Sequence, residues 1–353
     1  MRLLDRYIMR TVIVQTMMVF TVMVGLYFFS TVIREMGYVG KGSYSNLDAL
    51  TISVMLLPRQ AYELFPLVAL IGSMMGLGAL AGSSELTVMR TAGLSVRRLS
   101  VSVLKAGLLM IAVVIAVGEG VAPELEKQAH TMRLKAMVRG VSLNTGDSLW
   151  AKDGESFISI RWLGHNGEAR GVNLYRMQGQ QLLEIATATR ARYREGEWQL
   201  SGVTRTHFSE EGVSVEQSDS FSWPSRLAPE MINLASMKPE NLSVWELRGL
   251  IDYLQENGLA SQRYEVAMWI RIFAPLSTAG MVLLALPFVF GSLRMVGVGA
   301  RVMMGAMIGI VFYLVNNVFA RMGLLYDIPP MISAVTPALL VFTFWFIMMR
   351  RVR

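Results

Sequence analysis

The chain has 353 residues, of which 53% are apolar and 17% are charged, and its formal net charge is +7. Ordinary globular domains carry roughly a quarter charged residues, so this composition excludes a simple soluble enzyme and an intrinsically disordered chain and favours a membrane protein. The sequence has no cysteine, which excludes a disulfide framework, a thiolate metal site and a thiol nucleophile.

Six apolar stretches are long enough to cross a bilayer, which requires about 20 apolar residues per helix. They contain no charged residue except Lys105 near the start of the third, where a lysine side chain can reach the membrane interface. The first is too long for a cleaved signal and no small-residue cleavage site follows it, so we expect a retained anchor. The stretches cover 11–33, 64–84, 99–118, 272–293, 302–320 and 328–349, three on each side of a polar middle region.

Basic residues in the short connecting segments predict the orientation. The two chain ends and the segments after the second and fourth stretches hold twelve basic residues against two acidic ones, whereas 122–266 holds 16 basic and 19 acidic residues. The twelve are Arg2, Arg6, Arg10, Arg90, Arg97, Arg98, Lys105, Arg294, Arg301, Arg350, Arg351 and Arg353. Because cytoplasmic loops carry the excess of Lys and Arg, we predict cytoplasmic termini and a periplasmic middle region. Topology thus explains most of the positive charge, and we expect no nucleic-acid partner.

Part of the middle region alternates apolar and polar residues in the manner of β-strands. The alternating apolar positions are Ile158, Ile160, Trp162, Trp198, Leu200, Val213 and Val215. Turn signals separate them, at Asp153-Gly154, Asn166-Gly167, Gln178-Gly179, Glu195-Gly196 and Glu211-Gly212. We therefore predict an all-β sandwich or jelly roll over about 141–225, small enough to be open along one edge, where it could pair with another chain.

Helical segments are predicted on both sides of this β region. One covers 123–139, and another begins at Ser243, where Glu246 three residues later completes a capping-box pattern. A third short segment, 261–271, leads into the fourth apolar stretch. The expected organisation is three spanning helices in 1–121, a periplasmic domain in 122–266 and three spanning helices in 267–353.

The sequence contains none of the catalytic motifs for which we searched. It has no Gly-x-Ser-x-Gly and no His-Glu-x-x-His, and its three histidines are too far apart for metal-ligand spacing. Gly40-Lys41-Gly42-Ser43 resembles part of a nucleotide-binding loop, but position 35 is Glu35 where that pattern needs glycine. We expect no catalytic residue, metal or cofactor, which disfavours an intramembrane enzyme and leaves any energy supply to a partner.

An amphipathic helix is predicted at about 83–98, between the second and third stretches. Ser83 or Ser84 can cap it, which places Glu85 in the first turn, where a carboxylate is favourable. The residues alone leave two interpretations open. The segment is either a helix at the membrane interface or a docking helix whose Glu85 pairs with an arginine of a cytoplasmic partner.

Two cations, Arg34 and Lys41, follow the first stretch on the predicted outer side, against the usual charge bias. They either anchor the helix at the interface, with Glu35 balancing the charge, or attract an anionic lipid headgroup, because phosphates bind Arg and Lys through charge-assisted hydrogen bonds. Both interpretations stay open at this point.

Small residues are dense in the second and fifth stretches, at spacings that let helix backbones approach each other. We expect ordinary close packing there, with a sliding seam between helices as the alternative. The glycines are Gly72, Gly76, Gly78, Gly82, Gly305 and Gly309.

Short motifs spread over nearly the whole chain occur in a characteristic order around this layout of three and three spans. They are Leu4-Asp5-Arg6-Tyr7-Ile8, Ser84-Glu85-Leu86, Leu149-Trp150-Ala151-Lys152-Asp153-Gly154, Arg263-Tyr264, Met268-Trp269, Phe273-x-Pro275-Leu276-Ser277, Phe290-Gly291-x-Leu293-Arg294 and Ile328-Pro329-Pro330. With them the chain resembles the LptF/LptG family, the permease subunits of the ABC transporter that exports lipopolysaccharide. The stretch that begins at Leu149 is more similar to the LptG branch than to the LptF branch.

The resemblance implies a helical membrane protein of six spans with an inserted jelly-roll-like periplasmic domain, in the bacterial inner membrane. Its implied partners are an LptF-like permease subunit, an LptB-like ATPase dimer and an LptC/LptA-like periplasmic bridge. Lipopolysaccharide would enter a cavity between the two permease subunits from the outer leaflet and pass to the periplasmic β domains.

The resemblance also implies site residues. Glu85 and Arg90 would contact the ATPase. The lipid phosphates would meet basic residues at the outer end of the first span, for which Arg34 and Lys41 are the nearest matches and Arg133 is a further candidate. The resemblance also implies a lysine in the first span. Counted without gaps from the first motif, the position of that lysine falls near Thr31, about one turn before Arg34. Arg301 is cytoplasmic in the predicted topology, so we leave it out of this site.

A function of another class is compatible with the same residues. The chain could be a membrane-anchored scaffold or mechanotransmitter that binds periplasmic partners through its β domain and carries no lipid between its spans. Crosslinking from the first and fifth spans to lipopolysaccharide distinguishes the two functions.

Overall fold

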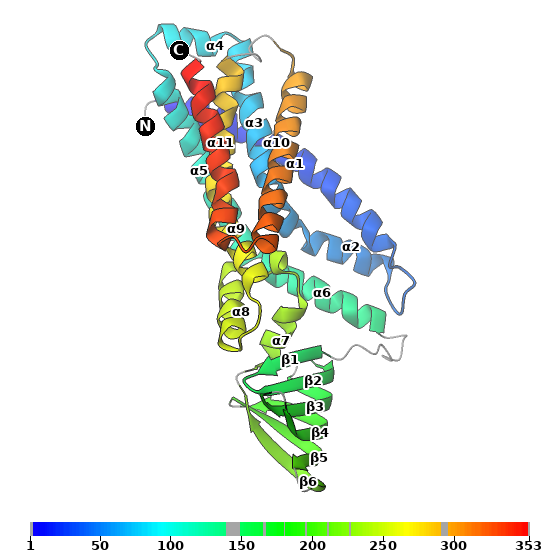
Figure 1. Ribbon diagram of the computed structural model, residues 1–353. Coiled ribbons are helices and arrows are strands. Elements are labelled where there is room, and N and C mark those ends of the chain that lie inside the picture. Colours follow the sequence, from blue (N-terminus) through cyan, green and yellow to red (C-terminus); the bar gives the residue numbers. More distant parts are fainter. Residues whose placement is uncertain are drawn as a thin grey trace. The chain divides into compact units, whose positions relative to one another are not determined.

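The computed structural model describes residues 3–138, 149–164, 167–179, 181–194, 196–209, 212–225, 227–290 and 296–351. It divides into two compact units (Figure 1). The helical unit comprises Met1–Ser142 and Gln262–Arg353, and the β unit comprises Leu143–Ser261. Some predicted features lie outside the described residues, namely Arg2, Arg139, Arg294, Arg353, the segment 141–148 and the turn residues Asn166, Glu195 and Glu211.

Six helices of the helical unit are long and apolar enough to cross a membrane, and each contains most of one predicted stretch. They are α1 (Leu3–Met36), α3 (Leu57–Gly82), α5 (Val96–Gly120), α9 (Gln262–Phe290), α10 (Val298–Leu325) and α11 (Pro330–Arg351). This confirms the predicted fold class, a helical membrane protein with an inserted β domain. The segment 261–271, expected to lead into the fourth apolar stretch, is almost entirely the first part of α9.

Shorter helices complete the chain. They are α2 (Asn46–Met55), α4 (Glu85–Thr91), α6 (Ala122–Val138), α7 (Pro229–Ser236), a 3-10 turn (Pro239–Asn241) and α8 (Val244–Glu256). The capping box at Ser243 is confirmed, since its side chain accepts a hydrogen bond from the backbone of Glu246 and the Glu246 carboxylate accepts one from the backbone of Ser243. Helix α2 was not predicted, although Ser45 and Asp48 form the same motif at its start.

The β unit holds one antiparallel sheet whose strands are neighbours in sequence order, β1 to β6. The strands are β1 (Leu149–Asp153), β2 (Ser156–Leu163), β3 (Glu168–Gln178), β4 (Gln181–Arg194), β5 (Glu197–Ser209) and β6 (Gly212–Pro224). Short turns join each pair, and the glycines of all five predicted turns have positive φ, as tight hairpins require. Because no long connection intervenes, the described strands form one up-and-down sheet, and not the two stacked sheets of the predicted sandwich.

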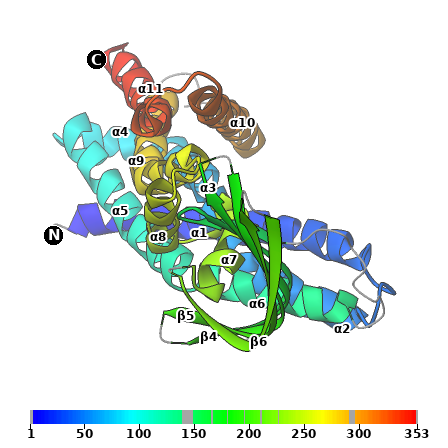
Figure 2. The same ribbon diagram turned by 60° about the horizontal axis from the view of Figure 1, so that its bottom comes forward.

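The sheet curves around α7, as Figure 2 shows. Trp198 is fully buried in this curve, and its indole N–H donates to the carbonyl of Leu227 at 2.9 Å. Ile232 of α7 belongs to the same apolar core. In the edge strand β6, Val213 and Val215 remain exposed.

Close helix packing at glycine confirms the expectation for the second stretch. Helix α1 crosses α3 where a Cβ on Gly72 would overlap the Cα of Thr16. One turn further along α3, a Cβ on Gly76 would lie 3.0 Å from the Cα of Val12. The two backbones therefore approach as closely as small residues allow, and this crossing fixes the path of α1 through the helical unit.

Replacement of Gly72 by leucine is expected to destabilise the protein by about 1–3 kcal/mol, because the new side chain meets the backbone of α1 and neither helix can yield locally. Gly25 is the matched control, since a Cβ there has no atom within 4 Å. Thermal unfolding of the purified chain in detergent checks both variants. Equal melting temperatures for G72L and G25L would contradict the tight crossing.

Candidate functional site

The end of α1, helix α2 and helix α6 lie together at one end of the helical unit, away from α4 (Figure 1). Two of the three predicted lipid-site cations lie there. Lys41 follows the end of α1, and its Nζ lies 5.0 Å from the ring centroid of Tyr38. Arg133 of α6 lies over the same ring, with its Cζ 5.9 Å from the centroid. The fold thus joins residues that are far apart in the sequence, and we call this end the α2 end.

Arg34 lies in the last turn of α1, exposed, at the same end of the unit. Its Nη2 lies 3.5 Å from the hydroxyl of Thr31. Thr31 itself is fully buried and accepts a hydrogen bond of 2.7 Å from the side chain of Gln60 in α3. Of these two α1 positions, only Arg34 presents a charge to the surroundings.

Arg133 makes an ion pair that was not predicted. Its Nη2 lies 2.7 Å from Oε1 of Glu35, and its Nε donates to Oε2 at 3.1 Å. The hydroxyl of Tyr44 donates to the same Oε2 at 2.9 Å. Glu35 is 1% exposed, so the pair and the tyrosine satisfy a carboxylate that would otherwise be buried at a high cost. Glu35 therefore ties the end of α1 to α6 and does not merely balance Arg34.

Tyr44 keeps its proton in this environment. Burial, followed by the hydrogen bond to the Glu35 carboxylate, raises the pKa of Tyr44 to about 12. The phenol therefore remains a hydrogen-bond donor throughout the physiological pH range.

The local structure accounts for the glycines in the segment between Gly40 and Ser43. Gly42 has φ +64°, and a Cβ there would lie 2.5 Å from the carbonyl oxygen of Met137 in α6. The backbone N–H of Ser43 donates to the carbonyl of Ala136 at 2.8 Å. Since these contacts hold the segment against α6, they place Lys41 and account for the glycine pattern that resembles a nucleotide-binding loop.

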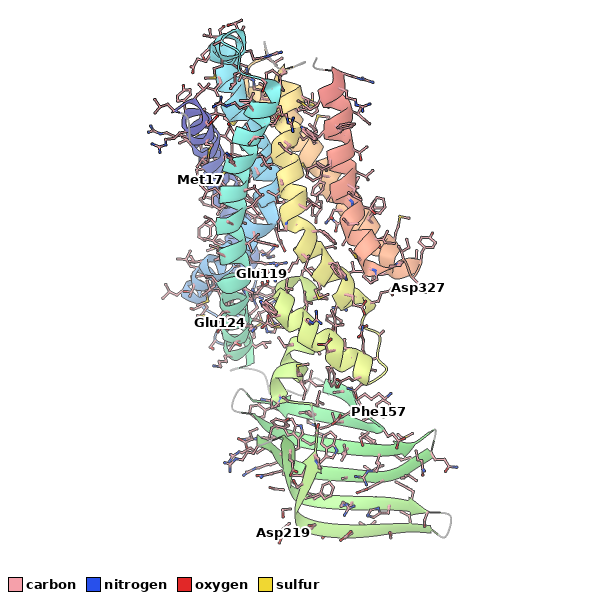
Figure 3. The ribbon with its side chains drawn as sticks, turned by 90° about the vertical axis from the view of Figure 1, so that its left-hand side faces the viewer. Met17, Glu119, Glu124, Phe157, Asp219 and Asp327 are labelled. Atoms are coloured by element: carbon pink, nitrogen blue, oxygen red, sulfur yellow. The ribbon has the colours of Figure 1, made fainter. Side chains whose placement is uncertain are left out.

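A second ion pair lies near the same end, between α5 and α9. Arg271 is 6% exposed, and its Nη1 lies 3.2 Å from Oε1 of Glu119. Figure 3 shows Glu119 and Asp327 at the end of the helical unit away from α4. The pair connects α9 to the last turn of α5.

The spanning helices differ greatly in burial. In the most apolar stretches of α3 and α9, 72% of the residues are buried within the chain, against 11% in α1 and 17% in α10. Helices α1 and α10 therefore offer apolar faces that the described chain does not cover. These faces can contact lipid or another protein.

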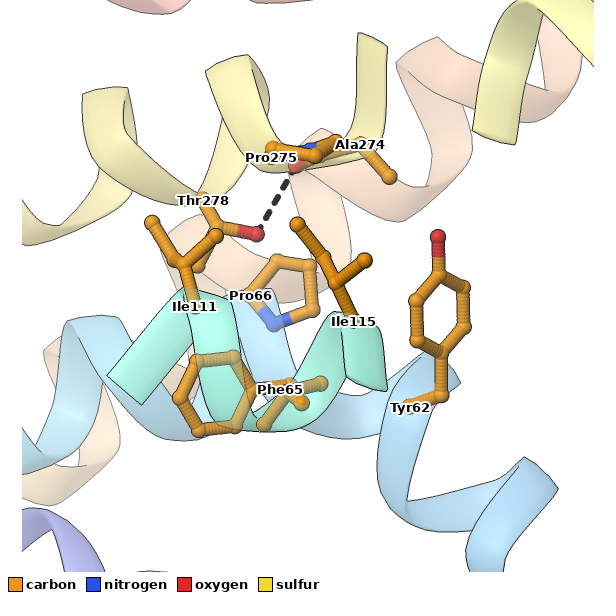
Figure 4. Close-up of a pocket in the computed structure, with 9 residues that line it drawn as sticks. Tyr62, Phe65, Pro66, Ile111, Ile115, Ala274, Pro275 and Thr278 are labelled. Carbon is orange, nitrogen blue, oxygen red and sulfur yellow. Dashed lines mark hydrogen bonds between the residues drawn. The ribbon is translucent and has the colours of Figure 1, made fainter. Parts of the chain in front are cut away.

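The interior between α3, α5 and α9 holds a small pocket (Figure 4). Two prolines within helices, Pro66 and Pro275, line it together with Tyr62 and Ile111. Its volume of about 20 Å³ leaves room for roughly one water molecule. A pocket of this size cannot hold an acyl chain.

The other end of the helical unit holds the chain ends and α4 (Figure 1). The segment 83–98, expected as one helix, contains α4, a turn and the start of α5. Glu85 lies in the first turn of α4, as predicted, but the predicted serine cap is wrong. Ser84 occupies the N-cap with φ 61° and makes no side-chain cap, because the chain reverses sharply there between α3 and α4.

Glu85 accepts hydrogen bonds from two side chains instead. The hydroxyl of Tyr7 in α1 donates to Oε2 at 2.8 Å, and that of Ser83 donates to Oε1 at 2.8 Å. These bonds, with that of Tyr7 first, lower the pKa of Glu85, so the carboxylate is charged at neutral pH. Tyr7 connects the start of α1 to α4, and a contact made by α4 therefore bears directly on α1.

Arg90 lies on the same helix but in a different environment. Its guanidinium lies over the ring of Phe290 at the end of α9, 5.3 Å from the centroid. A pocket of about 330 Å³ opens here between α4 and α9, with Leu86 and Val289 in its wall. The structure does not bring Arg90 and Glu85 together, so the two predicted contact residues present separate features on α4.

The chain is similar to known proteins over nearly its whole length. The sequence profile of the family described as "Lipopolysaccharide export system permease LptF/LptG" matches residues 6–351. The chain belongs to the LptF/LptG family. It is 34% identical over 339 residues to the lipopolysaccharide export system permease protein LptG of Escherichia coli strain K12, which covers 95% of this chain and 94% of the relative. The LptG protein of Haemophilus influenzae is 32% identical over 352 residues, 99% of this chain and 98% of the relative.

Both of these relatives are named LptG, in agreement with the similarity of the Leu149 stretch to that branch of the LptF/LptG family.

Arg301, which sequence reasoning placed at the opposite end from the lipid site, is 6% exposed and lies against α3. A Cβ on Gly78 would lie 2.6 Å from its Nη1, so the glycine makes room for the arginine.

Sequence reasoning missed Tyr7, Glu35, Tyr38 and Tyr44. Tyr7 lies in the first motif that carries the resemblance to the LptF/LptG family, and that motif was the available signal. Glu35 was noted only as a neighbour of Arg34. The two other tyrosines lie in a segment without periodicity, where no local signal indicates a contact.

Proposed function

We propose that this LptF/LptG family member is a non-catalytic permease subunit of an ABC transporter that extracts lipopolysaccharide from the outer leaflet of the bacterial inner membrane. The match to the LptF/LptG family over residues 6–351 carries this proposal. We further propose an LptF-like permease subunit, an LptB-like ATPase dimer and an LptC/LptA-like periplasmic bridge as its partners. The β unit then passes the lipid to that bridge.

The physical problem requires an energy source outside this chain. Several acyl chains must leave the bilayer, and each buried CH₂ is worth about 0.8 kcal/mol. Only coupling to ATP hydrolysis can drive this repeatedly, and the sequence offers no nucleotide-binding motif. We assign hydrolysis to a cytoplasmic ATPase that contacts Glu85 and Arg90 on α4.

A cavity shared with a second permease subunit fits the burial of the helices. The uncovered faces of α1 and α10 are apolar, and the pocket between α3, α5 and α9 is too small for lipid. A second subunit that faces α1 and α10 would enclose a space of suitable size and character. The chain ends and α4 lie at one end of the helical unit. This supports the proposal that the termini are cytoplasmic and that the α2 end faces the periplasm.

Arg34, Lys41 and Arg133 are the proposed contacts of the lipid phosphates. Two of them are exposed and the third is partly exposed. Charge-assisted hydrogen bonds from such groups suit phosphate, which offers several anionic oxygens. The α2 end is then the entrance to the cavity.

Charge reversal at Arg34 or Lys41 is expected to weaken lipopolysaccharide binding at least about tenfold and to reduce its stimulation of ATP hydrolysis, since attraction becomes repulsion at the phosphates. Purified complexes in nanodiscs that carry R34E or K41E permit both measurements. K135E is the matched control, because Lys135 is an exposed cation on α6 near Arg133.

Two results would contradict the proposal. Unchanged binding in both variants would remove these residues from the lipid site, and equal losses in K135E would indicate a general field effect. Photo-crosslinkers in α1 and α10 test the function itself. If they form no adduct with lipopolysaccharide while the complex exports it normally, the chain is a scaffold and not part of the conduit.

A further inference from the structure

The aromatic ring of Tyr38 lies close to two of the cations at the α2 end. Lys41 and Arg133 both lie within cation–π distance of Tyr38, at 5.0 and 5.9 Å from its centroid. Two like charges without a shared partner would repel each other, and the electron-rich face of an aromatic ring offsets that repulsion. Tyr38 is itself fixed by edge contact with Tyr44, at 6.4 Å between centroids and 71° between planes.

The second cation of this pair is held from its buried side. Arg133 presents Nε and Nη2 to Glu35, which leaves Nη1 out of the ion pair. Its side chain is 25% exposed, against 2% for that of Glu35. A guanidinium has five N–H donors. The buried carboxylate of Glu35 binds one edge of the Arg133 guanidinium and fixes its orientation, and the remaining N–H donors stay available for a phosphate.

Glu35 could play either of two roles toward a phosphate. It could be a competitor that the phosphate displaces from Arg133, or a fixed support that keeps the guanidinium in place. Displacement would leave a buried carboxylate without its cation, which costs more than one additional phosphate contact returns. The burial of Glu35 and the bond from Tyr44 therefore favour the fixed support.

We propose that Tyr38 and Glu35 are positioning residues that hold Lys41 and Arg133 as a two-cation clamp for one phosphate monoester of an anionic lipid. This inference rests on the proposed function for the lipid and deepens it. The clamp needs the aromatic ring of Tyr38, not its hydroxyl, and it needs the negative charge of Glu35.

Variants of Tyr38 test the clamp in the complete complex in nanodiscs. Binding of diphosphoryl lipid A is expected to be unchanged in Y38F and about five- to tenfold weaker in Y38L, which loses both cation–π contacts. The ratio of affinities for diphosphoryl over dephosphorylated lipid A should fall in Y38L and be retained in Y38F. A merely structural defect would weaken both lipids equally. Equal binding by Y38L and wild type, or an unchanged ratio, would overturn the proposal.

The sign of the effect at Glu35 gives a second test that needs no change in Tyr38. E35Q is expected to bind lipid A more weakly, because Arg133 loses its support, and tighter binding would show that Glu35 competes with the phosphate and would overturn the clamp. Binding of inorganic pyrophosphate by the same complexes separates this inference from the proposed function. If wild type binds no lipid A but binds pyrophosphate in a manner that depends on Tyr38, the clamp holds and the lipid function fails. If it binds neither, both fail.

Discussion

Replacement of Arg133 by alanine is expected to destabilise the protein by about 3–5 kcal/mol, because it leaves Glu35 buried without its cation. The pair is short, 2.7 Å between Nη2 and Oε1, and the carboxylate is 1% exposed. Only the bond from Tyr44 would remain, and a neutral phenol does not neutralise a carboxylate. Glu35 and Arg133 connect α1 to α6, so we expect the α2 end of the helical unit to lose its order first.

The double variant E35A/R133A distinguishes this cause from simple loss of side-chain packing. Removal of both charges eliminates the unpaired carboxylate, so the double variant should be more stable than R133A alone. Thermal unfolding of the purified chain in detergent measures the stability of E35A, R133A and E35A/R133A. K135A is the control for loss of an exposed cation on α6. Additive losses from E35A and R133A would contradict a coupled pair.

Loss of stability in R133A complicates the interpretation of its lipid binding. A fall in lipopolysaccharide binding by R133A combines the lost phosphate contact with a disturbed α2 end. Exposed Lys41 has no such structural role toward Glu35, so a change at that position reports on the contact more directly.

Local rules predicted much of the fold. A spanning helix needs a long apolar stretch and nothing else, so six such stretches gave six helices. The capping box at Ser243 spans only four residues, and the hairpin glycines each act within one turn. Such features depend on neighbours in the sequence, and tertiary contacts did not override them.

Features that depend on tertiary contacts were not predictable in this way. Glu35 meets Arg133 across 98 positions, and Tyr7 meets Glu85 across 78. The serine cap of α4 failed because the reversal after α3 forces Ser84 into the left-handed region, where its side chain does not reach the first turn. The candidate cations could be named from the sequence, but the residues that position them could not.

Helix α1 joins both candidate sites. It runs without proline for 34 residues, which corresponds to about 50 Å at the usual rise. Its first turns hold Tyr7, which donates to Glu85, and its last turn holds Glu35, which pairs with Arg133. Between them it crosses α3 closely at Gly72. If an ATPase binds α4 as proposed, a displacement of α4 would therefore reach the α2 end through one continuous helix.

Replacement of Glu85 by lysine is expected to reduce ATPase stimulation by lipopolysaccharide at least about tenfold, because a docking carboxylate becomes a repelling cation at the contact. It also removes the acceptor of Tyr7, so that α1 loses its tie to α4. Y7F separates the two effects. It keeps the Glu85 charge for the ATPase and deletes only the bond to α1, so the ATPase should still copurify while its stimulation by lipid falls.

Copurification of the ATPase and its hydrolysis rate, with and without lipopolysaccharide, measure these outcomes. Arg97 is exposed at the same end of the helical unit, and R97E is the control for a general change of charge there. Normal export by E85K, or equal losses in R97E, would contradict a docking role for Glu85. Full stimulation in Y7F would show that α1 receives the motion of α4 by another route, since the hydroxyl of Tyr7 is the side-chain donor from α1 to Glu85.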